Sequence, residues 1–319
     1  MSLLNKIKLN YNLKLFQDYI KDQKFEEAYS LIQDVKKKDE TNFFLLLRNS
    51  QKLLNNLPPD FYKTKIIWTI SYDLSDLTYI NSFLDYYLAK NLNLSFRLEN
   101  FANSLNNYFS KLDPKSQEKN IQFDDFITQS NFFQNLLLFD INKDYLFLNS
   151  CASFFETGEK NYFIYPNITF CYFYIINRPE HLLLRYKNKF NSSEASYDEL
   201  FNYNDKQFLN HHQENQIFKV YENRKNININ VKSWTDENVI NTYKGKIISY
   251  QRLLNNTQEV LIEILYHLKQ YGMPIDVNID DVKQFISKNK IIPNIDGALS
   301  NKDVKFLNKN LDQTIDYFN

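Results

Sequence analysis

Few residue types in this chain offer chemistry at a spacing that a reaction could use. Cys151 follows a short apolar run and could act as a nucleophile, although a single cysteine there more often fills a core position. His181 is better explained as a surface residue near a helix start than as a general base. His211, His212 and Glu214 suggest a metal site, but adjacent histidines in a polar loop seldom both bind one ion. We therefore predict no metal site.

Two arginines offer a possible anion site. Arg178 and Arg185 are seven residues apart, which is two turns of a helix, so they could share one face and hold an anion. Surface cations at a helix end are the alternative explanation for the same pair.

Composition limits the classes of function. The chain has 319 residues, of which 38 are basic and 38 acidic, and 43% are hydrophobic, so it can bury a core. The neutral balance argues against nonspecific nucleic-acid binding. Two cysteines cannot form a secreted disulfide scaffold, and no apolar run is long enough to span a membrane. We expect a cytoplasmic protein without a membrane span or a nucleic-acid partner.

Glycine placement argues against an ordinary nucleotide site in the first half. The four glycines are Gly158, Gly245, Gly272 and Gly297, so none precedes residue 158. A phosphate-binding loop between a strand and a helix needs residues without a Cβ, because backbone N–H groups must approach the anion. Neither a Walker loop nor a GxGxxG turn fits residues 1–157.

Residues 1–57 predict a helical N-terminal segment. Apolar side chains recur at helical spacing on both sides of a break at residues 22–24. Residues 19–28 resemble the turn of a tetratricopeptide helix pair, of which one copy is visible. The segment is either a helical cap on the next domain or a unit that docks a protein partner.

The rest of the chain, residues 63–319, predicts one α/β domain. Residues 65–72, 145–148, 169–176 and 246–250 are apolar runs typical of parallel strands that are covered on both faces, and residues 77–90 follow a helical period. Aromatic residues between 162 and 174 indicate core packing. Residues 192–232 are polar and rich in asparagine, which predicts a surface excursion. We expect a parallel sheet of about five strands, flanked by helices.

Three segments in this domain resemble one enzyme family. Residues 68–81, WTISYDLSDLTYIN, are similar to the donor loop W-x-x-S-Y-P-K-S-G-N-T-W of bacterial sulfotransferases. Residues 174–186 are similar to the family's Y-I-V-R-D-P-R-D-V-x-x-S-Y, and residues 247–261 to its V-x-R-Y-E-D-L-L-x-D-P-x-x-x-L. The resemblance covers about residues 63–319 and implies a P-loop-related sulfotransferase fold.

The resemblance also implies a donor site for the sulfate donor PAPS, but most of its chemical groups are replaced. The family's lysine, glycine and proline in the donor loop are Leu74, Asp76 and Asp73 here, and its catalytic histidine falls on Cys151. The family's phosphate-binding arginine falls on Asn177, and its phosphate-binding serine falls on Arg185. The implied donor-site positions are Ser71, Tyr72, Asp73, Leu74, Ser75, Asp76, Leu77, Thr78, Asn177, Arg178 and Arg185.

These replacements predict weak donor binding. Asp73 and Asp76 would face a polyanion, and we expect Asp76 to cap the following helix where a phosphate would otherwise bind. Three functions remain open. The first is a degenerate sulfotransferase-like protein, which requires no cofactor and binds a ligand or partner. The second is an active enzyme that transfers sulfate from PAPS to a carbohydrate, lipid or protein hydroxyl. The third is an interaction protein that acts through residues 1–57.

Overall fold

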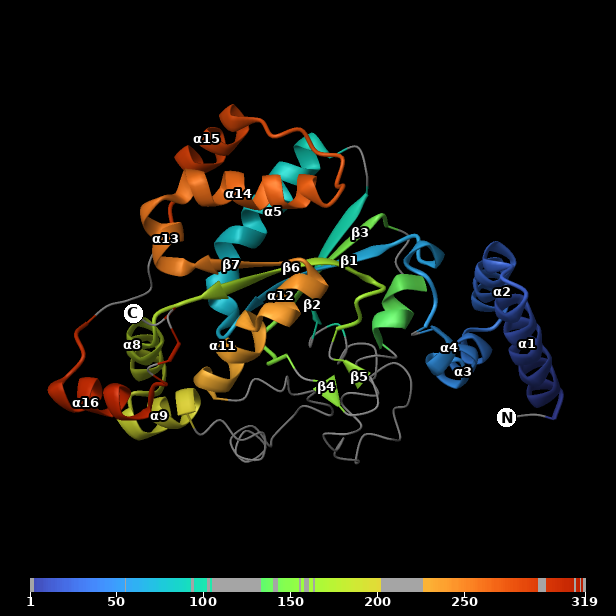
Figure 1. Ribbon diagram of the computed structural model, residues 1–319, viewed down its shortest axis with the longest axis horizontal. Coiled ribbons are helices and arrows are strands. Elements are labelled where there is room, and N and C mark those ends of the chain that lie inside the picture. Colours follow the sequence, from blue (N-terminus) through green and yellow to red (C-terminus); the bar gives the residue numbers. More distant parts are fainter. Residues whose placement is uncertain are drawn as a thin grey trace.

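A five-stranded parallel sheet runs through the middle of the protein (Figure 1). Its strand order is β2-β3-β1-β6-β7, and every neighbouring pair is parallel. The strands are β1 (Lys65–Ser71), β2 (Phe96–Asn100), β3 (Tyr145–Ser150), β6 (Thr169–Ile176) and β7 (Gly245–Ser249); β4 (Glu156–Thr157) and β5 (Asn161–Tyr162) form a separate antiparallel pair. The predicted α/β fold with a parallel sheet is confirmed.

The structure is a computed structural model that describes part of the chain. The described residues are 3–54, 56–92, 95–101, 104, 133–139, 143–154, 156–157, 161–162, 164–201, 226–291, 297–312, 314–315 and 317. None of the helices within these ranges combines the length and the apolar character that crossing a membrane requires.

Helices cover both faces of the sheet, as the apolar runs of the strands require. Strand side chains alternate between two cores, so that Ile66 and Trp68 belong to one and Ile67 to the other. One face is covered by α5 (Thr78–Asn91), α13 (Tyr250–Asn255), α14 (Thr257–Gln270) and α15 (Ile279–Lys288). The opposite face is covered by α8 (Pro179–Phe190), α9 (Ser193–Phe201), α11 (Ile227–Thr235), α12 (Glu237–Tyr243) and α16 (Asn301–Asn310).

The N-terminal helices lie at one end of the molecule (Figure 1). They are α1 (Leu3–Lys21), α2 (Phe25–Lys38), α3 (Glu40–Asn49) and α4 (Gln51–Leu54), and the short helix η1 (Pro59–Phe61) leads from them to β1. Helix α2 packs on the helical residues 133–139, where Lys36 Nζ donates to the Phe139 carbonyl at 3.1 Å and the Tyr29 and Phe139 rings lie 5.5 Å apart. Their buried side chains belong to the same apolar core as one face of the sheet.

The prediction of a surface excursion over residues 192–232 is wrong at both ends of that range. Residues 192–232 are not simply a surface excursion, because they contain α9 and the start of α11, and Leu200 and Val231 are buried. One of the asparagines lies in the interior, because Asn230 is fully buried and accepts a hydrogen bond from the Tyr174 hydroxyl at 2.6 Å. Residues 202–225 lie outside the described part of the chain.

Candidate functional site

The candidate site lies where two neighbouring strands send their helices to opposite faces of the sheet. β1 continues into α5 on one face, whereas β6 continues into α8 on the other. In open α/β sheets, ligands bind in the crevice outside the carboxyl ends of such strands. The turn of residues 72–77, which contains the short helix η2 (Leu74–Leu77), lies there, and so does Asn177.

A buried carboxylate lies at the centre of this strand-end region, which we call the crevice. The side chain of Asp76 is fully buried, and its Oδ1 accepts from Arg185 Nη2 at 2.8 Å and from Asn177 Nδ2 at 2.9 Å. Its Oδ2 accepts from the Ser71 hydroxyl at 3.3 Å. Both oxygens therefore have protein partners, as a buried charge requires.

Arg185 reaches from α8 across the crevice to the turn. Besides Asp76, it contacts the Ser75 hydroxyl with Nη1 at 2.7 Å and Asp73 Oδ2 at 3.4 Å. Its side chain is 12% exposed, and its buried Nε has no hydrogen-bond partner within the described part of the structure. The guanidinium thus links α8, on one face of the sheet, to the turn that precedes α5, on the other.

The capping role predicted for Asp76 belongs instead to Asp73. Asp73 Oδ1 accepts from the Ser75 backbone N–H at 2.9 Å and from the Ser75 hydroxyl at 2.7 Å, and so caps η2. Helix α5 begins after Leu77, which makes no side-chain cap bond. Asp76 points inward because η2 rotates it toward Arg185, so the prediction that it caps a helix is wrong.

Burial controls the ionisation of this cluster. Burial raises the pKa of Asp76 to about 6, and the attraction of Arg185 offsets only part of that rise. Burial opposes the charge of Arg185, but the carboxylates of Asp76 and Asp73 outweigh it and raise its pKa. Burial also raises the pKa of Tyr250, with a smaller contribution from Asp76. Proton transfer from a substrate to Asp76 would require access to a carboxylate that is completely enclosed.

The other residues between 72 and 78 pack or lie on the surface. Tyr72 is buried, and its hydroxyl donates to the Glu199 carbonyl at 2.7 Å. Leu77 is buried and Leu74 is partly buried against the core beneath α5. Ser75 and Thr78 are exposed. Leu74, at the position where the sequence resemblance implies a lysine, therefore contributes packing rather than charge.

Cys151 lies at the end of β3, on the other side of β1 from β6. The residue is partly buried, and its carbonyl accepts from Asn230 Nδ2 at 3.1 Å. Nearby, the Thr69 hydroxyl donates to the side chain of Asn149 between the two strands. The backbone at Cys151 thus belongs to a buried polar network that fixes the strand end against α11.

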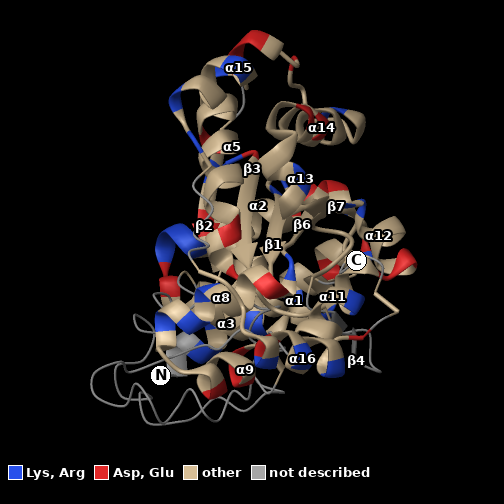
Figure 2. Ribbon diagram, turned by 90° about the vertical axis from the view of Figure 1, so that its left-hand side faces the viewer, with Lys and Arg blue, Asp and Glu red and all other residues tan. Residues whose placement is uncertain are grey.

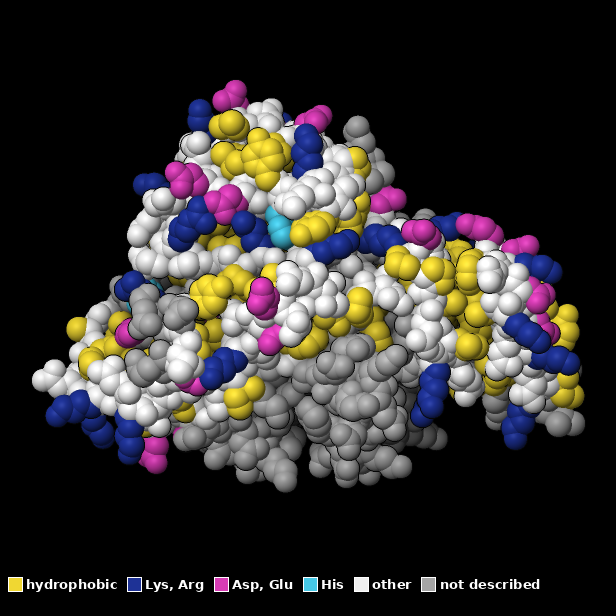
Figure 3. Space-filling model, in the orientation of Figure 1, with side chains coloured by type: hydrophobic (Ala, Val, Ile, Leu, Met, Phe, Trp, Pro, Cys, Tyr) yellow, Lys and Arg dark blue, Asp and Glu magenta, His cyan; other side chains and the backbone are white. Residues whose placement is uncertain are grey.

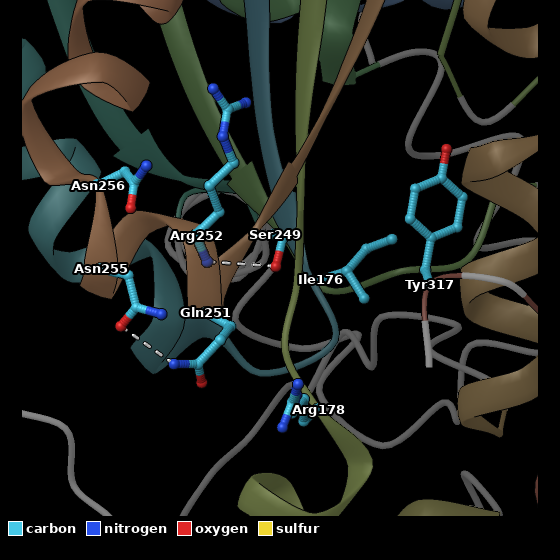
Figure 4. Close-up of a pocket in the computed structure, with 8 residues that line it drawn as sticks. All are labelled: Ile176, Arg178, Ser249, Gln251, Arg252, Asn255, Asn256 and Tyr317. Carbon is cyan, nitrogen blue, oxygen red and sulfur yellow. Dashed lines mark hydrogen bonds between the residues drawn. The ribbon is translucent and has the colours of Figure 1, made fainter. Parts of the chain in front are cut away.

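Arg178 and Arg185 have different surroundings and not the shared face that their spacing suggested. Arg185 turns into the crevice, whereas Arg178 is the residue before α8 and its side chain is exposed. Arg178 instead lines a separate cavity of about 300 Å³ between the ends of β6 and β7 (Figure 4). The strand end changes direction between the two positions, so helical spacing did not apply to Arg178.

His181 was predicted to lie on the surface, but it is half-buried beside the crevice. Its Nδ1 lies 3.2 Å from Asn177 Oδ1, and burial, followed by the charge of Arg178, lowers its pKa. Asn177 therefore joins His181 to Asp76, a link that the sequence did not suggest. The sequence signal for this contact was the spacing of Asn177 and His181, which are four residues apart across a helix start.

The described residues contain no group of three histidine, cysteine, aspartate or glutamate side chains placed to hold a metal ion. His211, His212 and Glu214 lie outside those residues. Beside the residues of the crevice, α8 and α16 carry both acidic and basic side chains, whereas the charged residues of α9 are all acidic (Figure 2). The pairing of opposite charges inside the crevice thus continues on α8 and α16.

The chain matches no protein-family model, and no curated protein sequence matches it.

Proposed function

We propose that this protein is sulfotransferase-like in architecture but does not transfer sulfate, and that it functions by binding a ligand or a protein partner. One observation carries the proposal. The buried Asp76 carboxylate, held by Arg185, Asn177 and Ser71, lies in the turn where the resemblance implies a donor phosphate. An internal anion with its own cation thus fills the position that an external anion would need.

The arrangement of the three similar segments supports the family assignment. They correspond to β1 with its turn and α5, to β6 with α8, and to β7 with α13 and α14. All three strands are parallel and adjacent, and their carboxyl ends meet at the crevice. The P-loop-related fold remains part of this proposal.

Magnitudes favour loss of donor binding. A micromolar ligand has about 8 kcal/mol of binding free energy. A like-charge pair at about 5 Å costs roughly 3 kcal/mol at an effective dielectric constant near 20. PAPS would face Asp73 and Asp76, and recruiting Arg185 to its phosphates would leave Asp76 buried without a cation. These costs together can cancel most of the affinity of an ordinary donor site.

A thermal-shift titration with PAPS and with adenosine 3′,5′-bisphosphate tests the proposal. A ligand at 100 times its dissociation constant adds about 2.7 kcal/mol, or roughly 5 °C for a chain of this size. We expect no shift at about 1 mM of either compound. A saturable shift that is lost in Arg185→Ala, together with sulfate transfer to a hydroxyl acceptor, would instead establish the active sulfotransferase.

A second candidate function is partner docking by the N-terminal helices. Ile7 and Tyr11 are 57% and 66% exposed on α1, beside a groove of about 340 Å³ whose lining includes Leu31 and Val35. Apolar side chains are visible among charged ones at this end of the molecule (Figure 3).

Point substitution tests this candidate better than removal of residues 1–57, because those residues share a core with the sheet. We expect Tyr11→Ala to abolish capture of a partner by the full chain. Tyr266→Ala, which alters a 56% exposed tyrosine on α14, should leave capture intact. Equal capture by the two variants would eliminate the N-terminal helices as the docking surface.

A further inference from the structure

We infer that the cavity beside Arg178 is a binding site for a phosphorylated sugar. The cavity has a volume of about 300 Å³, near the lower end of the range for small-molecule sites. It is distinct from the Asp76 crevice, so the inference stands whether or not the crevice binds PAPS. The lining residues are Ile176, Arg178, Ser249, Gln251, Arg252, Asn255, Asn256 and Tyr317.

Arg178 supplies an available positive charge. Within the described part of the chain, its guanidinium makes no ion pair and no side-chain hydrogen bond, and the residue is exposed. Arg252 differs, because its guanidinium points away from Arg178 (Figure 4) and is bound by Glu263. An unpaired arginine in a cavity suits a phosphate group, which it can bind with two parallel hydrogen bonds.

Two long helices begin at this cavity. Arg178 precedes the first turn of α8 and Asn256 that of α14, and neither makes a side-chain cap bond. The partial positive charges of both helix starts therefore add to that of Arg178. The acidic residue Glu259 in the first turn of α14 accepts from Asn256 Nδ2 at 3.1 Å, and Glu263 is held by Arg252 and Lys246. Glu180, in the first turn of α8, does not line the cavity.

The rest of the lining matches sugar hydroxyls rather than a bare anion. Side-chain amides both donate and accept, as hydroxyl groups do. Gln251 Nε2 donates to Asn255 Oδ1 at 3.3 Å, which leaves further donors and acceptors on both amides, and Ser249 adds a hydroxyl (Figure 4). Tyr317 stands on the far side of Ile176 from α13 and provides an aromatic ring face. A phosphomonoester is favoured over a sulfate ester because its greater negative charge gains more from an electropositive site.

Calorimetric titration of the full chain with glucose 6-phosphate, glucose, glucose 6-sulfate and inorganic phosphate tests the inference. We expect glucose 6-phosphate to bind more tightly than each of the other three. Arg178→Ala should weaken its binding about tenfold or more, whereas Arg178→Lys should restore part of it. Arg48→Ala, which removes an exposed arginine on α3, is the matched control and should leave the affinity unchanged.

Several results would overturn the inference. They are no heat of binding at about 10 mM glucose 6-phosphate, equal loss in Arg178→Ala and Arg48→Ala, and equal affinity for inorganic phosphate. Tighter binding of adenosine 3′,5′-bisphosphate, with the same dependence on Arg178, would show a nucleotide site instead. Because Arg178 is exposed, its variants should keep the melting temperature of the parent protein, and that measurement confirms that they are folded.

Discussion

Asp76 and Arg185 show why a buried ion pair costs more to break than to replace. Removing the guanidinium leaves the Asp76 carboxylate buried without a cation. We expect Arg185→Ala to lower the free energy of unfolding by about 3–5 kcal/mol, measured by urea denaturation. Arg48→Ala, on the exposed face of α3, should change it by less than about 0.5 kcal/mol.

The double variant Asp76→Leu, Arg185→Met separates the charge from the packing. Apolar replacement of both partners removes the desolvation cost, so we expect it to recover most of the stability that the single variant loses. If Arg185→Ala alone has the same midpoint of urea denaturation as the parent protein, the ion pair does not stabilise the turn.

The raised pKa of Asp76 gives a defined pH dependence. Its folded pKa of about 6 lies above the usual aspartate value of about 3.9, so the folded state binds more protons between these values. The contribution of Asp76 to stability therefore falls as pH rises from about 4 to about 6, and stays constant above that. Urea denaturation across this range should show that slope in the parent protein and lose it in Asp76→Asn. An unchanged slope in the variant would assign it to another group.

At the scale of elements, Gly245 fixes how closely β7 approaches β6. A Cβ at this position would overlap the Tyr172 ring, whose hydroxyl is held by the Trp234 carbonyl at 2.6 Å. We expect Gly245→Ala to cost about 1–3 kcal/mol of unfolding free energy by overpacking. Lys246→Ala, one residue along, removes a partly exposed ion pair and should cost less. Equal losses would contradict the overlap.

A buried aspartate anchors the C-terminal helix α16 on α8 and α9. Asp303 accepts from Lys187 Nζ at 2.6 Å and from the Tyr197 hydroxyl at 2.7 Å, and it forms a capping box with Ser300. Burial alone would raise its pKa, but the bonds from Lys187, Ser300 and Tyr197 outweigh burial and lower it.

This depressed pKa stabilises the folded state at neutral pH. The stabilisation is complete above the usual aspartate pKa of about 3.9 and is lost as pH falls through the lower folded value. We expect Asp303→Asn to lower the midpoint of urea denaturation at pH 7, and the difference from the parent protein to shrink below about pH 4. A difference that is the same at pH 7 and pH 3 would show that geometry, rather than charge, anchors the helix.

At the scale of the whole molecule, the hydrophobic pattern of the sequence predicts the buried strands well, but it predicts the polar edge strand and the polar contacts poorly. Residues 169–176 were predicted as a strand and form β6 with the same bounds, because a continuous apolar run leaves few alternatives. β2 was missed because it is an edge strand that contains Arg97 and Glu99 and is only half-buried. Asn256 is the residue before α14, and its side chain binds Glu259 instead of capping the helix.

The sequence indicated several residues of the candidate site but not the contacts between them. Residues 71–78, Asn177, Arg178 and Arg185 were the implied donor-site positions. The structure brings Ser71, Ser75, Asp76, Asn177 and Arg185 into contact, whereas Arg178 lines a separate cavity. The pairing of Asp76 with Arg185 joins residues 109 positions apart, so no local pattern specifies it. Long-range charge pairing of this kind follows from the fold and not from the local sequence.

The most direct test of the account is a crystal structure of the full chain grown with adenosine 3′,5′-bisphosphate. We expect Asp76 Oδ1 to remain within hydrogen-bonding distance of Arg185 Nη2 and Asn177 Nδ2, with no phosphate in the turn of residues 72–77. A phosphate bound beside Ser75, with Arg185 turned away from Asp76 to meet it, would contradict the account.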